Sequence, residues 1–244
     1  MARRHDIDRI LQEWPYEPGE ISARIVRATD GREVLQMRVE MGVLQLETEG
    51  RPDGQRPGGA DTYFDQLSRL AAKAGEAFEL TPDQCAEADR EFMQYYHRRV
   101  CWLALREFRR AAVDADHTLA FMDFVRDHNS DEEWTLSHEQ YRPFVLFHRA
   151  QAATLATLEE KGPEDALVEL NRGLQRFRDL FSQYEAEDQF DEDELVQRLL
   201  ELRDTLREQY DLKPSLSEQL ADAVAHEQYE LAAKLRDELS RRGK

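Results

Sequence analysis

In this chain of 244 residues the spacing of the apolar residues becomes helical near Tyr63 and stays helical to the end. Before it, apolar and polar residues alternate over residues 21–49; after it, apolar residues recur every three or four positions. Side chains alternate between the two faces of a strand and repeat about every 3.6 residues in a helix. The sequence therefore predicts a mainly α fold: an antiparallel helical-repeat array with a small N-terminal β hairpin or sheet and a C-terminal helical hairpin.

The N-terminal region, residues 1–60, combines a short helix with β structure. The helix is predicted over residues 6–14, and two alternating runs on either side of Asp30–Gly31 predict a hairpin with one buried face. Gly42 is followed by two apolar residues in succession, a pattern that predicts a β-bulge within a long second strand. A two-stranded hairpin is marginally stable alone, so we expect a further strand, a helix or a second subunit to cover it.

The polar loop Arg51–Gly59 is a candidate ligand site, because binding residues often lie on loops beside a rigid element. Its candidate residues are Arg51, Asp53 and Arg56. The alternative interpretation is ordinary turn chemistry, which also places glycine and proline at such positions.

Residues 61–185 predict a helical domain. Thr81 is followed by Pro82 and, three positions on, by Gln84, which marks a helix start with a capping box; this helix runs to about Leu105. The large and small residues that follow resemble a degenerate tetratricopeptide repeat: Tyr95, Trp102, Phe108, Ala111, Ala115 and Leu119. A second unit is predicted from its first helix at residues 141–158, a turn at Gly162–Pro163 and a second helix with Ala166, Leu167, Leu170, Leu174 and Phe177.

Two features of this domain depart from a regular repeat. The spacing from Ala111 to Ala166 exceeds the length of the regular repeat, so an extra connection is expected near residues 128–138. Pro143 predicts either a kink or a late start to the helix that contains it.

An acidic run at residues 185–194 leads into a linking helix at residues 190–213. Its apolar seam has near-heptad spacing, at Leu195, Leu199, Leu202 and Leu206. The seam either packs on the repeat helices or pairs with a second copy of the chain.

The last segment, residues 214–244, predicts two short antiparallel helices. Ser215 and Glu218 form a capping box after Pro214, and a second apolar stripe begins at Tyr229. Two helices of this length bury little area alone, so their apolar faces require a third surface.

The second helix carries a sequence that resembles the UVR motif, the helical hairpin by which the excision-nuclease subunits UvrB and UvrC recognise each other. The resemblance lies in Tyr229–Glu230, Ala232–Ala233 and Leu235–Leu239. It implies a bacterial protein that docks on a protein partner, or on a second copy as a homodimer. The candidate partner-binding residues are Leu216, Leu220, Val224, Tyr229, Ala232, Leu235, Arg236 and Leu239. The alternative is a hairpin that only completes the fold.

The composition limits other functions. The net charge is -18, which disfavours direct contact with nucleic acid, and no apolar run has the length of a membrane span. Cys85 and Cys101 lack metal-ligand spacing, and no nucleotide-binding or hydrolase motif is present. We therefore expect no cofactor and no metal, no catalytic residues that can be named, and a cytoplasmic location.

Three functional hypotheses remain. The first is a non-enzymatic adaptor that docks through the hairpin and a helical-repeat surface. The second is an accessory factor of nucleotide excision repair that acts through a partner of the UvrB or UvrC type. The third is an enzyme with a site near the Arg51–Gly59 loop.

Overall fold

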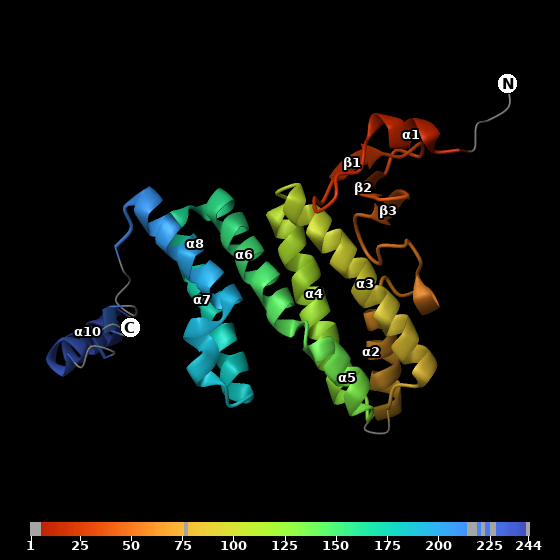
Figure 1. Cartoon of the computed structure of the whole chain (residues 1–244). Helices are drawn as coiled ribbons and strands as arrows, with labels where there is room; N and C mark the ends of the chain where they lie inside the picture. Colours follow the sequence, from red (N-terminus) through yellow and green to blue (C-terminus); the bar gives the residue numbers. More distant parts are fainter. Residues whose placement is uncertain (1–5, 76–77, 214–218, 221–222, 225–227, 243–244) are drawn as a thin grey trace. The chain divides into compact units, whose positions relative to one another are not determined.

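The computed structural model describes residues 6–75, 78–213, 219–220, 223–224 and 228–242. The chain divides into two compact units, residues 1–199 and 200–244, and each is described by itself. The described part is mainly helical with one small antiparallel sheet near the N-terminus, as the sequence predicts (Figure 1).

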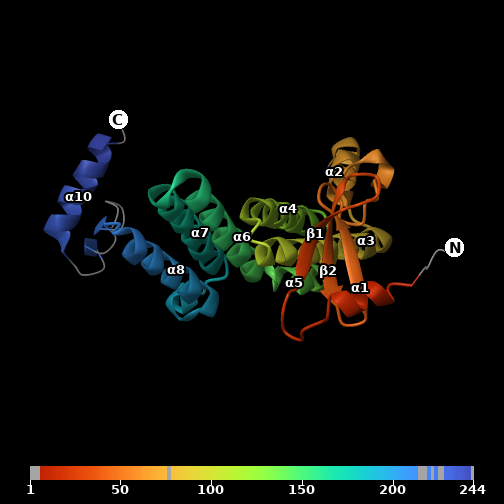
Figure 2. The same ribbon diagram turned by 90° about the horizontal axis from the view of Figure 1, so that it is seen from above.

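The sheet contains β1 (Ala23–Arg27), β2 (Glu33–Val39) and β3 (Gly42–Glu47), side by side in that order (Figure 2). A short helix, α1 (Asp8–Glu13), precedes it. The prediction of one long second strand with a bulge at Gly42 is wrong. Val39 pairs with Gly42 across a two-residue turn, and Met41 at that turn is 89% exposed.

The hairpin register explains the misreading at Gly42. Leu35 pairs with Leu46, and Met37 pairs with Leu44, so odd positions of β2 share a face with even positions of β3. A bulge and a tight turn both shift the alternation of apolar and polar residues by one position. The spacing of apolar residues alone therefore does not distinguish them.

One face of the sheet packs on α3 (Pro82–Ala104). Leu35 and Leu46 are buried in a cluster with Cys101 and Trp102 of α3, and Ile25 packs against this cluster. A third strand and a helix thus both cover the predicted hairpin.

The helical body contains α2 (Tyr63–Ala74), α4 (Phe108–Asp127), α6 (Arg142–Lys161) and α7 (Pro163–Gln183) in addition to α3. Successive long helices pack together: α4 packs on both α3 and α6, and α6 packs on α7 (Figure 1). The capping box of Thr81 and Gln84 is present. Pro143 lies in the first turn of α6, so of the two alternatives the late helix start is correct.

The extra connection after α4 contains a helix of its own, α5 (Glu132–Glu139). Asp131 caps it by accepting a hydrogen bond from the backbone N–H of Trp134 at 3.0 Å.

The acidic run forms a 3-10 helix, η3 (Glu187–Glu192), with Phe190 buried. α8 (Glu194–Tyr210) follows, and Asp193 accepts hydrogen bonds from the backbone N–H groups of Leu195 and Val196 at its start. In the predicted seam Leu199 and Leu206 are buried, whereas Leu195 and Leu202 are half-buried.

The last described helix is α10 (Tyr229–Arg242), and the short described pieces at 219–220 and 223–224 are also helical. No helix in the described part of the chain has the length and apolar composition to cross a membrane.

Candidate functional site

The C-terminal hairpin has a small apolar core of its own. Ala223, Ala232 and Leu235 are 3%, 8% and 6% exposed, and Leu220 packs against them. Small alanines on both segments permit this close packing. Three of the eight predicted partner-binding residues belong to this hairpin core or pack against it: Ala232, Leu235 and Leu220.

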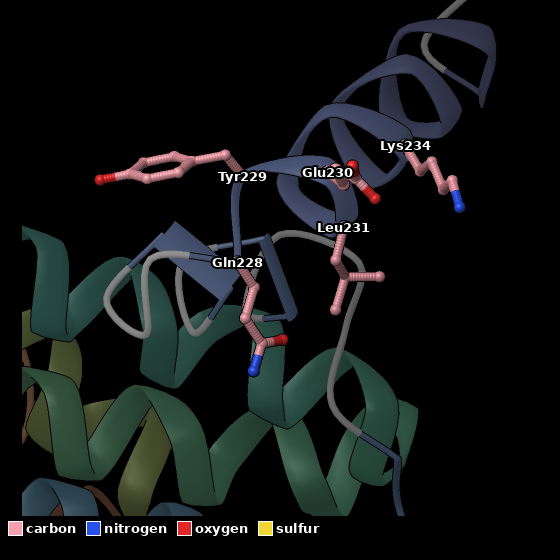
Figure 3. A pocket seen from close by; sticks show the side chains of 5 residues that line it. All are labelled: Gln228, Tyr229, Glu230, Leu231 and Lys234. Atoms are coloured by element: carbon pink, nitrogen blue, oxygen red, sulfur yellow. The ribbon is translucent and has the colours of Figure 1, made fainter.

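A second set of side chains lies on the outer surface. Tyr229, Val224 and Leu231 are 68%, 53% and 44% exposed. Tyr229 points away from the first turn of α10, while Gln228 and Leu231 lie on another side of that turn (Figure 3). A shallow hollow of about 490 Å³ is lined by Gln228, Tyr229, Glu230, Leu231 and Lys234. These exposed apolar residues are available for contact with a partner.

Three predicted residues of the hairpin remain: Arg236, Leu216 and Leu239. Arg236 is exposed and lies 3.5 Å from Asp237 in an ion pair. Leu216 lies outside the described residues, as does the side chain of Leu239. Leu231 was not among the predicted residues. It lies two positions after Tyr229 and therefore on a different side of the helix.

The second candidate site, the Arg51–Gly59 loop, is built around a buried cation. Arg51 is 2% exposed and forms ion pairs with Glu87, with Glu91 at 3.4 Å and with Asp53 at 3.6 Å. Its charge therefore fixes the loop to α3. Asp53 is also held, because it accepts a hydrogen bond from Gln94 Nε2 at 3.0 Å.

Arg56 forms an ion pair with Asp61 on the surface. Both residues line an open hollow of about 930 Å³ beside the end of β3. The loop thus brings Arg56 to the surface, whereas Arg51 and Asp53 are engaged in structural contacts.

A buried polar network joins this loop to the helices. Glu91 is fully buried and accepts hydrogen bonds from the backbone N–H groups of Tyr63 and Phe64, at 2.6 and 3.1 Å. Its carboxylate also lies 3.1 Å from His117 Nε2. Glu91 therefore satisfies two of the free donors at the start of α2 and connects α2, α3 and α4.

A second part of the network holds the end of β3. Arg98 donates hydrogen bonds to both carboxylate oxygens of Asp114, at 2.9 and 2.7 Å. Its third nitrogen donates to the carbonyl oxygens of Glu47 and Gly50, at 3.1 and 2.8 Å. Asp114 raises the pKa of Arg98 despite the opposing effect of burial.

A third part links α3 to α6. Arg99 donates to His148 Nδ1 at 3.3 Å and to Thr118 Oγ1 at 3.0 Å. Burial lowers the pKa of Arg99 to about 10, and burial together with the Arg99 charge lowers the pKa of His148 to about 4. His148 is therefore neutral near pH 7 and accepts the hydrogen bond.

The sequence did not indicate this network, because its hydrogen-bonded partners lie far apart along the chain. Most residues of this network are buried, as is usual for polar residues with a structural role. Burial also raises the pKa of the Cys101 thiol to about 12, which keeps the sulfur protonated and unreactive. Among the described residues, no group of three or more His, Cys, Asp or Glu side chains is arranged to hold a metal ion.

Comparison with known proteins finds a match for one region of the chain. A family model described as the UvrB/uvrC motif matches residues 212–241. No curated protein and no solved structure matches the chain. The resemblance to the UVR motif is thus confirmed for the C-terminal hairpin, and the tetratricopeptide resemblance of the helical body stays a prediction.

Proposed function

We propose that this protein is a non-enzymatic adaptor of the cytoplasm that docks on a protein partner through its C-terminal hairpin. The observation that carries the proposal is the match of the UvrB/uvrC motif to residues 212–241, a motif associated with protein interaction. The exposed apolar residues of the same segment, Tyr229, Val224 and Leu231, support it.

Buried and exposed residues of the hairpin have different roles in this proposal. Ala223, Ala232 and Leu235 hold the two helical segments together, so they support docking indirectly. Tyr229 is the main anchor, since large aromatic side chains at the centre of an interface often cost about 2 kcal/mol or more when truncated. Arg236, at 70% side-chain exposure, orients the partner by pairing with a carboxylate.

The helical body supplies a second docking surface in this proposal. Its long helices α3, α4, α6 and α7 pack in sequence, an arrangement that supports a tetratricopeptide-like array. Such arrays present extended faces to partners.

The test is an affinity measurement on the full chain. Purified protein, a Tyr229→Ala variant and an Arg241→Ala control would each be titrated with candidate partners and examined for self-association by sedimentation. Arg241 is an exposed position on α10 that is not among the residues assigned to docking. We expect Tyr229→Ala to weaken binding about 30-fold and the control about twofold or less. Equal affinities for both variants would contradict the proposal.

A second candidate is an accessory role in nucleotide excision repair, favoured by the identity of the matched motif. It predicts saturable binding to the corresponding hairpin of UvrB or UvrC. Binding to other proteins but to neither of these hairpins would support the general adaptor over the repair factor.

A further inference from the structure

A hollow of about 360 Å³ lies between the end of β3 and α4. The buried residues that line it include Tyr95, Arg98, Trp102 and Asp114, and the exposed lining includes Val113 at 60% exposure. It combines aromatic and aliphatic surface with cationic groups. This volume is at the lower end of the range of roughly 300–1,000 Å³ for small-molecule sites.

Arg110 lines this hollow; it forms ion pairs with Glu33 and Glu107 but donates no hydrogen bond to a described residue. Its guanidinium carbon lies 4.8 Å from the ring centroid of Trp102, so the cation stacks on the indole. In the described part of the chain it donates no hydrogen bond, and its enclosed Nη1 has no acceptor. The nearest carboxylates, Glu33 and Glu107, are at 3.8 and 3.7 Å, beyond hydrogen-bond range.

The other two arginines of the hollow already donate hydrogen bonds to residues of the chain. Arg98 binds Asp114 and two backbone carbonyl groups. Arg109 donates two hydrogen bonds to Glu160. Arg110 can therefore bind a ligand without breaking a hydrogen bond to a described residue, and its stack on Trp102 holds the guanidinium plane in place before the ligand arrives.

We propose that this hollow binds a small organic carboxylate whose apolar or aromatic body rests against Val113. A guanidinium presents parallel N–H donors that match the two oxygens of a carboxylate. A single negative charge is favoured over a phosphate, because Glu33, Glu49 and Glu107 surround the site and repel a multiply charged ligand more strongly. The inference is independent of the adaptor function, since it uses no residue of the hairpin.

The experiment titrates the full chain with benzoate and observes the indole N–H signals of the three tryptophans by NMR. The signals are assigned by replacing Trp14 and Trp134 with Phe, one at a time. We expect a saturable shift of the Trp102 signal, with the signals of Trp14 and Trp134 unchanged. Shifts of similar size at all three indoles would overturn the proposal, because they would indicate dispersed surface binding.

Two variants test the cation. Arg110→Gln removes the charge and the fork, so the affinity for benzoate should fall at least about tenfold. The control is Arg172→Gln, an arginine of α7 that is 70% exposed and does not line the hollow, for which the affinity should change by about twofold or less. An unchanged affinity in Arg110→Gln would refute the site.

A third variant is expected to increase binding and so does not depend on a loss of folding. Glu49 lines the hollow, is exposed and forms no ion pair with a described residue. Glu49→Gln should tighten benzoate binding by roughly two- to threefold, the size of one screened charge contact. Phosphate, titrated in parallel, should bind more weakly than benzoate; tighter binding of phosphate, or weaker benzoate binding in Glu49→Gln, would contradict the assignment of a monocarboxylate site.

Discussion

Gly173 of α7 lies directly against Ala150 of α6: a Cβ atom added to Gly173 would lie 2.6 Å from the Cβ of Ala150. Real Cβ contacts essentially never approach so closely. The neighbouring atoms belong to an alanine, which has no flexible side chain to move aside. The glycine therefore sets how closely α6 and α7 approach.

The first prediction is that Gly173→Ala destabilises the protein by about 1–2 kcal/mol. Alanine gains up to about 1 kcal/mol of helix propensity over glycine, but overpacking of a helix interface costs about 1–3 kcal/mol. Urea denaturation measures the difference. The control is Arg172→Ala, because Arg172 is 70% exposed and its ion pair lies on the surface. A stabilised Gly173→Ala protein would show that the two helices separate without cost.

The second prediction concerns the buried ion pair that holds the end of β3. Arg98 and Asp114 are 4% and 3% exposed, so Asp114→Ala leaves an uncompensated guanidinium in the core. We expect a loss of about 3–5 kcal/mol in the free energy of unfolding.

Its control is the ion pair Arg109–Glu160, which also has one residue on α4. Both side chains of that pair are about half exposed, at 52% and 46%. Glu160→Ala should therefore cost about 1 kcal/mol or less. Similar costs for the two variants would mean that the buried pair adds nothing beyond its surface counterpart.

The third prediction is a pH dependence caused by His148. Its folded pKa is lowered to about 4 from an ordinary value of 6.5, by burial and by Arg99. Between these values the unfolded chain binds a proton that the folded chain does not. Stability from this residue is therefore complete above about pH 6.5 and falls as the pH drops towards 4, by about 3 kcal/mol in total.

The measurement is the free energy of unfolding at pH 7 and pH 5 for the natural chain and for His148→Gln. Glutamine retains an acceptor for Arg99 but does not titrate in this range. The variant should lose less stability between the two pH values, and the difference isolates His148 from the carboxylates. An identical slope in both proteins would show that His148 does not control this dependence.

Short-range sequence patterns predicted the helical part of the fold well. The capping box at Thr81 and the first-turn Pro143 act within a few residues of their position, so the sequence contains the whole interaction. The burial of Arg51 with Glu87 depends instead on residues far apart in the chain. Spacing along the sequence carries no information about such pairs, and for this reason the sequence did not indicate that Arg51 fixes the loop to α3.

The hairpin shows the same limit. An apolar stripe indicates that a helix face is covered, but it does not indicate which surface covers it. Tyr229 and Ala232 both belong to the predicted stripe, yet the first is exposed and the second lies in the hairpin core.

The fourth prediction separates these two roles. Ala232→Glu introduces a carboxylate among the apolar side chains of Ala223, Leu220 and Leu235, where burial of a charge is costly. The two helical segments should separate, with a loss of helicity confined to the hairpin and a loss of partner binding. Tyr229→Ala removes an exposed ring, so helicity should be retained while binding falls. Circular dichroism of the full chain, combined with partner affinity, distinguishes the outcomes. If Ala232→Glu retained both helicity and affinity, the alanine contact would not hold the hairpin together; if Tyr229→Ala lost helicity, the ring would support the hairpin rather than the partner.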